Sequence, residues 1–140
     1  GTYHPEDPFA LHKTTSYVRS TELRRRARRD GYDDVVMVSQ SGLVGEATCA
    51  NVVVVHEGTA MTPSLDGVLP GVTRRGLLEL AERNGEPIEV GEVTVETLLD
   101  ASEVALLSAG VGVLAARSVE GRELDDAWSR RASDWLAEAS

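Results

Sequence analysis

Four consecutive valines, Val52 to Val55, restrict the conformation of the middle of this 140-residue chain. β-Branched side chains lose rotational freedom in a helix but pack well on the pleated surface of a sheet, so Asn51–His56 is predicted as a buried strand. Glu57 and Gly58 then form a turn into a second strand, Thr59–Thr62. The sequence therefore predicts a β-hairpin whose first strand is buried.

Further strands and helices are predicted on both sides of this hairpin. Residues 1–8 show no apolar periodicity, which indicates an extended arm or a loop. Helices are predicted over residues 14–29, 73–83, 94–101 and 125–138, with Thr94 as the cap of the third. Strands are predicted over residues 34–39, 88–90, 103–107 and 111–116, and a tight turn at 120–121. The length suits one domain over residues 1–140, without an internal boundary.

The charge balance argues against a nucleic-acid surface. The formal net charge is -9, so a polyanion would be repelled except at a local basic patch. Arginines at positions 24–26 and 28–29 form such a patch, but aspartates follow it at once. Cations late in a helix complement the helix dipole, and a solvated helix end is therefore favoured over a phosphate-backbone site.

Other classes of protein are also disfavoured. Cys49 is the single cysteine, so no disulfide can form within the chain, which suits a reducing cytoplasm. No apolar run approaches the roughly 20 residues of a membrane span, and no signal peptide is evident. The three histidines, at positions 4, 12 and 56, lack the spacing of metal ligands. Gly110–Ala115 has the spaced glycines of a dinucleotide-binding loop, but the turn at 120–121 pre-empts the helix that should follow.

Lys13 is the only lysine, whereas the chain carries 13 arginines. Arginine is not deprotonated at any useful pH, but a partly desolvated lysine amine can lose its proton and attack a carbonyl to form a Schiff base. Lys13 is therefore a candidate nucleophile. The alternative is that arginine replaced lysine nearly everywhere and one exposed lysine was left over.

Three further polar features lie in apolar surroundings. Glu46 is expected between two strands, where a buried carboxylate needs a cation or a proton as its partner. Gly71-Val72-Thr73 opens a helix whose free backbone N–H groups could bind a phosphate. Ser108-Ala109-Gly110 breaks a buried strand with small residues, which is a second place where backbone donors could face a ligand. The alternatives are a salt-bridged glutamate, an ordinary helix start and a β-bulge.

Together these features are the parts that a pyridoxal 5′-phosphate (PLP) site requires, namely an amine for the aldehyde, an acid for the pyridine nitrogen and a cradle for the phosphate. From about residue 8 to residue 122 the chain resembles the class IV aminotransferase family, which includes branched-chain and D-amino acid aminotransferases and 4-amino-4-deoxychorismate lyases. The motifs that carry the resemblance are Lys13–Tyr17, Asp33–Val38, Ser41–Asn51 and Leu65–Arg74. The most specific of them are Glu-x-x-x-x-Asn before a strand and the helix entry Leu-Pro-Gly-Val-Thr-Arg.

The resemblance implies an α/β (α+β) fold, the large domain of PLP fold type IV, in which a mixed-sheet pseudo-barrel is flanked by helices. It also implies roles for individual residues. Lys13 would be the catalytic Schiff-base lysine, and Glu46 would hold a proton on the pyridine nitrogen. The phosphate would be bound by Val72 and Thr73, with Ser108 and Ala109 completing the cradle. Tyr17 would reach the ring hydroxyl.

Within the family, the second phosphate turn separates two functions. Branched-chain enzymes usually show Thr-Gly-Thr there, whereas Ser108-Ala109-Gly110 is closer to the lyase pattern. The resemblance thus implies a PLP-dependent 4-amino-4-deoxychorismate lyase, which eliminates pyruvate from a small amino substrate and leaves 4-aminobenzoate, a folate precursor. A branched-chain or D-amino acid aminotransferase is the alternative.

Members of the family have an additional N-terminal domain of about a hundred residues, an ordinary size for a domain. It supplies a phosphate-binding arginine, much of the substrate pocket and part of the dimer interface. We expect this small domain to be absent here and to be supplied in cis or in trans, and the apolar surface that it leaves to favour a homodimer or a complex with the missing half. A noncatalytic interaction domain that retains the fold is a hypothesis of another class.

Overall fold

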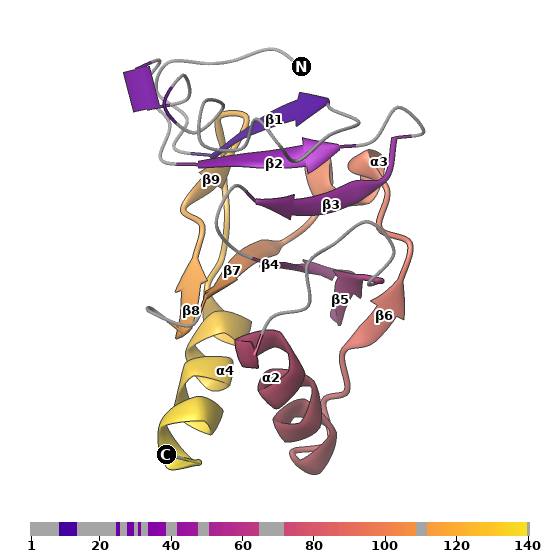
Figure 1. Ribbon diagram of the computed structural model, residues 1–140, viewed down its shortest axis with the longest axis vertical. Helices are drawn as coiled ribbons and strands as arrows, with labels where there is room; N and C mark the ends of the chain where they lie inside the picture. Colours follow the sequence, from indigo (N-terminus) through magenta and orange to yellow (C-terminus); the bar gives the residue numbers. More distant parts are fainter. Residues whose placement is uncertain are drawn as a thin grey trace.

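A computed structural model of the chain describes residues 9–13, 25, 28–29, 31, 34–38, 42–47, 51–64, 72–108 and 112–139. They are arranged in layers, with a small sheet at the top of Figure 1, a larger sheet in the middle and a pair of helices below. Among the described helices, none is long and apolar enough to cross a membrane.

The small sheet consists of β1 (Phe9–Lys13), β2 (Asp34–Val38) and β3 (Val44–Ala47), in the order β1-β2-β3. β1 runs parallel to β2, whereas β3 runs antiparallel to it, with an irregular register between Val36 and Val38. Both of these valines are fully buried and belong to the apolar cluster that the small sheet shares with the larger one. The small sheet is therefore held to the rest of the fold by its valines.

The larger sheet has the strand order β6-β5-β4-β7-β8. β5 and β6 are parallel, and the other neighbouring pairs are antiparallel, so this sheet is mixed as well. Its strands are β4 (Asn51–His56), β5 (Thr59–Pro63), β6 (Glu89–Gly91), β7 (Glu103–Ser108) and β8 (Gly112–Ala115).

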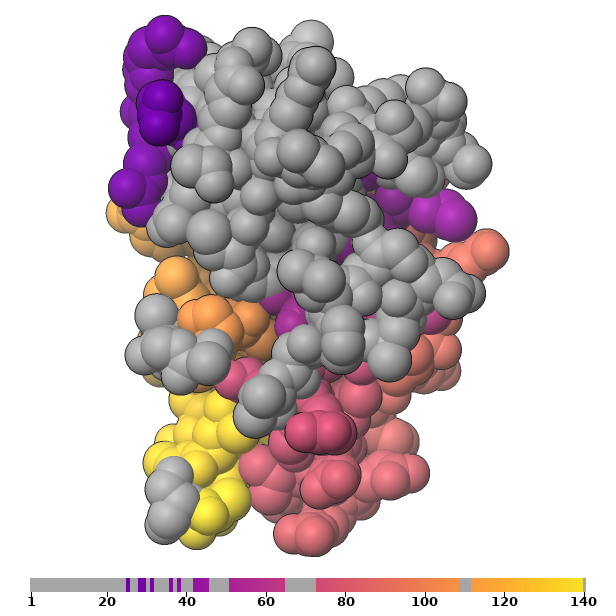
Figure 2. Space-filling model, in the orientation of Figure 1, coloured from indigo at the N-terminus to yellow at the C-terminus, as the bar shows by residue number. Residues whose placement is uncertain are grey.

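Helices α2 (Val72–Arg83) and α4 (Ala127–Glu138) contact each other below this sheet, and Figure 2 shows them side by side at the lower end of the molecule. The shorter elements are helix α3 (Val95–Leu99) and the hairpin strands β9 (Ser118–Val119) and β10 (Arg122–Glu123). As predicted, Trp128 and Trp135 lie on the buried face of α4, where their rings pack edge to face with centroids 6.3 Å apart.

β4 lies at the centre of the larger sheet and is buried on both faces, which explains its run of valines. Because successive side chains of a strand point to opposite faces, Val52 and Val54 join the cluster shared with the small sheet, whereas Val53 and Val55 join the cluster that contains the α2 and α4 side chains. The prediction of a buried strand at Asn51–His56 is confirmed.

The two predicted turns also form. In the β4–β5 hairpin, Glu57 and Gly58 have φ values of 51° and 80°, and in the β9–β10 hairpin Glu120 and Gly121 have φ values of 49° and 83°. Two successive positive φ values match the twist of the flanking strands, which is why glycine is favoured in such turns.

The helices predicted over residues 73–83, 94–101 and 125–138 correspond to α2, α3 and α4, and Thr94 caps α3 by accepting a hydrogen bond from the Thr97 N–H. Of the helix predicted over residues 14–29, the structure describes only positions 25, 28 and 29, which are helical. The strand over residues 9–13 had not been predicted. One expectation was wrong, because Glu46 was expected between two strands but lies within β3. Both strands pair with β2, and such non-local pairing leaves little trace in so few residues.

Candidate functional site

The two residues on which the predicted site depends both belong to the small sheet. Lys13 is the last residue of β1 and pairs with Val38 of β2, which in turn pairs with Val44 of β3. Glu46 lies two positions further along β3. Adjacent strands lie about 4.8 Å apart, so the backbones of Lys13 and Val44 are separated by about 10 Å, twice that spacing. Lys13 and Glu46 therefore lie on the two outer strands of one sheet.

The start of α2 supplies the predicted phosphate donors. Val72 is the first residue of this helix and Thr73 the second, and no acidic residue lies in the first turn. The first backbone N–H groups of a helix have no partner within it, and the helix dipole places partial positive charge there. The beginning of α2 therefore has the chemistry of an anion site.

Arg74, the third residue of α2, is a charged residue that sequence reasoning missed. It is only 6% exposed, and its Nη2 donates a hydrogen bond of 3.0 Å to the backbone oxygen of Pro63, the last residue of β5. Its Nε is buried and has no hydrogen-bond partner within the described part of the chain. Burial lowers the pKa of Arg74 from its usual value because desolvation disfavours the charged form. The only sequence signal was its place directly after Gly71-Val72-Thr73.

The second predicted phosphate segment lies at the end of β7. Ser108 is the last residue of that strand and pairs with Gly112 at the start of β8, so residues 109–111 connect two antiparallel strands. The sequence had suggested that this segment interrupts one strand. Instead, it connects the two strands of a hairpin. α2 contacts β7, and the two predicted phosphate segments thus belong to neighbouring elements. Ala109 and Tyr17 lie outside the described residues.

A buried carboxylate was also missed, and it has hydrogen-bond partners in the fold. Glu103, at the start of β7, is 5% exposed and accepts hydrogen bonds from the backbone N–H groups of Trp128 and Ser129, at 2.9 Å and 3.2 Å. These are the first-turn donors of α4. Glu103 therefore has a structural role, and its charge is compensated by the helix that it caps.

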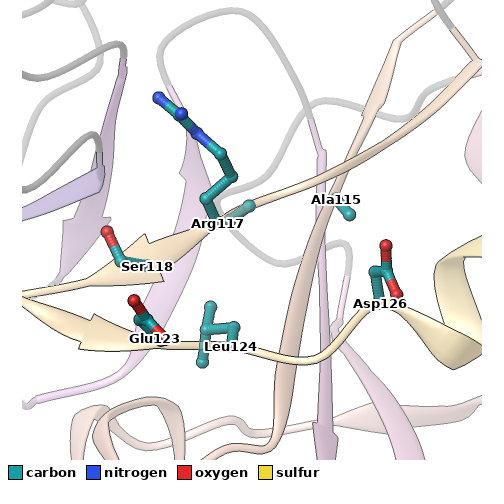
Figure 3. Close-up of a pocket in the computed structure, with 7 residues that line it drawn as sticks. Ala115, Arg117, Ser118, Glu123, Leu124 and Asp126 are labelled. Carbon is teal, nitrogen blue, oxygen red and sulfur yellow. The ribbon is translucent and has the colours of Figure 1, made fainter.

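A cavity of about 450 Å³ lies between the end of β8, the β9–β10 hairpin and the start of α4 (Figure 3). Arg117, Glu123 and Asp126 supply its charged groups, and all three are exposed. Of the predicted site residues whose side chains the structure describes, Thr73 and Ser108, neither lines this cavity. In the described residues there is also no cluster of His, Cys, Asp and Glu that could hold a metal ion.

The family model described as amino-transferase class IV matches residues 2–119 of the chain. A Thermotoga maritima protein described as a "Probable branched-chain-amino-acid aminotransferase" is 40% identical over 96 residues, which cover 68% of this chain and 35% of the relative. The chain therefore spans about a third of that relative's length.

Solved structures share the fold. A Legionella pneumophila protein described as a "Putative 4-amino-4-deoxychorismate lyase" superposes with a TM-score of 0.87 at 21% identity, over 99% of this chain and 57% of the other. The PLP-bound form of a Mycobacterium tuberculosis protein described as a hypothetical aminotransferase gives a TM-score of 0.84 at 22% identity, over 95% and 54%. The predicted α/β fold, that of the fold-type IV enzymes, is confirmed.

Proposed function

The chain belongs to the class IV aminotransferase family, and we propose that it binds PLP and transfers amino groups of branched-chain amino acids. The 40% identical relative from Thermotoga maritima supports this choice of reaction. The observation that carries the proposal of a PLP site is the position of Lys13 and Glu46 on the outer strands of one sheet.

The residues at the start of α2 fit the phosphate of PLP. Val72 and Thr73 offer backbone N–H groups in a first turn that contains no acidic residue. Next to them, Arg74 holds a buried guanidinium whose Nε has no partner among the described residues. A buried cation of this kind is costly unless an anion compensates it. A phosphate group at this end of α2 would provide that compensation.

Each residue of the proposed site has a separate task. Lys13 would anchor the cofactor covalently through Nζ, and its released amine would move the proton at the substrate Cα. Glu46 would hold a proton on the pyridine nitrogen. When bound, PLP supplies an electron sink for the substrate carbon. Val72, Thr73, Ser108 and Ala109 would orient the phosphate, and Tyr17 would contact the ring hydroxyl.

A 4-amino-4-deoxychorismate lyase is the second candidate, and Ser108-Ala109-Gly110 favours it. This segment replaces the Thr-Gly-Thr that is usual in branched-chain enzymes. The lyase would act on the same small-molecule class, an amino substrate, and would release pyruvate and 4-aminobenzoate. Both candidates use Lys13 and Glu46 in the same way, so they differ in the substrate and not in the cofactor site.

The partners of the chain are part of the proposal. We propose a cytoplasmic enzyme that works as a homodimer, with the small domain of the family supplied in cis or in trans. A chain without that domain would bind PLP weakly or serve as an interaction module, because part of the substrate pocket would be absent. The chain's coverage of about a third of its Thermotoga relative is consistent with a need for further residues.

The deciding experiment is an assay of the full-length gene product with PLP and two substrate sets. We expect amination of branched-chain 2-keto acids for the aminotransferase and release of 4-aminobenzoate from 4-amino-4-deoxychorismate for the lyase. Lys13→Ala should abolish whichever activity is found. A full-length product that takes up PLP but converts neither substrate would contradict both candidate reactions, and one that takes up no PLP would contradict the cofactor assignment itself.

A further inference from the structure

Arg74 differs from the other described arginines because it is buried and has no anionic partner in the described residues. Arg130 and Arg131 form salt bridges with Asp126 and Glu86 at the surface, and Arg75, the next residue of α2, is exposed. For Arg74 the recorded contact is the neutral carbonyl oxygen of Pro63. The Nε–H group of this buried guanidinium has no hydrogen-bond acceptor among the described residues.

The hydrogen bond of Arg74 connects two elements of the fold. Pro63 ends β5 and Val72 begins α2, so the Arg74–Pro63 hydrogen bond ties together the two elements that residues 64–71 connect. It fixes the first turn of α2 against the end of β5. Any displacement of that turn would change the direction in which the backbone N–H groups of Val72 and Thr73 point.

The energetics favour an anion nearby. A buried charge without a partner costs several kcal/mol even after relaxation, and natural folds compensate such charges with counterions or ligands. An arginine that served only to tie β5 to α2 would not need a charge, because a neutral donor makes the same hydrogen bond. A nearby anion would compensate this charge.

We propose that Arg74 is a positioning residue for the cofactor phosphate, which holds the first turn of α2 in place and provides a buried positive charge beside it. The proposal rests on the PLP site proposed above. Arg74 would thus be a cation of α2 itself that favours phosphate over neutral ligands. It would act in addition to any arginine that another domain contributes.

Two variants separate the charge from the hydrogen bond. Arg74→Gln removes the charge and retains an amide donor on a shorter side chain, whereas Arg74→Lys keeps the charge on a different donor. Arg75→Gln is the matched control, because it removes the same charge from an exposed position in the same helical turn. All are made in the full-length gene product, and circular dichroism confirms that each variant folds.

The variants are titrated with PLP and with pyridoxal, which lacks the phosphate, and melted with and without inorganic phosphate. We expect Arg74→Gln to weaken PLP binding at least about tenfold, the order of a lost charge-assisted interaction, while its affinity for pyridoxal stays that of the wild type. Phosphate should raise the melting temperature of the wild type, Arg74→Lys and Arg75→Gln, but not of Arg74→Gln.

Two results would overturn the proposal. One is an Arg74→Gln variant that binds PLP as tightly as the wild type, or that loses PLP and pyridoxal equally. The other is a folded Arg74→Lys variant that no longer responds to phosphate. If the wild type binds neither PLP nor pyridoxal, the proposed function fails; the melting experiment then decides separately whether Arg74 supports an anion site.

Discussion

The carboxylate of Glu103 accepts a hydrogen bond of 2.9 Å from the backbone N–H of Trp128, so β7 provides the cap at the start of α4. Asp126, the residue at the N-cap position, makes no such side-chain hydrogen bond. The contact joins the larger sheet to α4, which packs against it.

Replacing Glu103 should therefore destabilise the fold. We expect Glu103→Ala to lower the free energy of unfolding by about 1–3 kcal/mol, because the buried first-turn N–H groups of α4 would lose their acceptor. Denaturant unfolding measures this loss. Glu82→Ala, at an exposed position of α2, is the control and should change stability by less than about 0.5 kcal/mol. Equal stabilities of the two variants would show that the cap contributes nothing.

The two tryptophans of α4 should dominate the packing of this helix against the sheet. Trp128 is 3% exposed and packs edge to face on Trp135. Trp128→Ala should cost about 3–5 kcal/mol, the range for removing a buried aromatic side chain. Leu114→Ala, at a position that is 53% exposed, should cost far less. A Trp128→Ala loss below about 1 kcal/mol in denaturant unfolding would contradict the assigned core.

The β4–β5 turn should be improved by substitution. Glu57 has a φ of 51°, a region that asparagine tolerates better than glutamate. Glu57→Asn should therefore raise the free energy of unfolding by about 0.5–1 kcal/mol, a part of the roughly 1–2 kcal/mol that the left-handed conformation costs. The same change at Glu79, within α2, should lower stability because asparagine is the poorer helix former. A destabilised Glu57→Asn variant would mean that the side chain of Glu57 matters more than its backbone conformation.

The surface ion pair between Arg131 and Glu86 should contribute little. Their side chains are 48% and 40% exposed, although two hydrogen bonds of 3.0 Å and 2.8 Å join them. The hydrogen bond with Glu86 raises the pKa of Arg131, so the guanidinium stays charged throughout the accessible pH range. Glu86→Gln should cost less than about 1 kcal/mol, and the cost should shrink in high salt. A larger loss that is independent of salt would contradict a surface role.

Local patterns predicted the elements that local physics determines. Each of three elements has a residue type or a spacing that favours one structure. They are the valines of β4, the positive-φ turn at Gly58 and the tryptophans on one face of α4. Residues 9–13 showed none, because five residues of mixed polarity become a strand only when β2 pairs with them. The placement of Glu46 within β3 was missed for the same reason.

Lys13 could be selected from the sequence because it is the only lysine. Glu46 could be selected because a carboxylate in an apolar stretch is costly to bury without a partner. Arg74 and Glu103 could not, since arginines and acids look alike in the sequence until the fold shows that these two are buried. Burial and hydrogen-bond partners arise from tertiary packing. The charges that the fold buries were therefore visible only in the structure.

The most direct test of the PLP site is a titration of the full-length gene product with PLP, followed by its visible absorbance. Because Lys13 is the only lysine, Lys13→Arg removes the sole lysine amine of these 140 residues while keeping the positive charge. We predict that the wild type acquires the absorbance band of lysine-bound PLP, which borohydride reduction fixes on the peptide that contains Lys13, and that Lys13→Arg does not. An unchanged band in Lys13→Arg, or fixation on another peptide, would contradict the assignment.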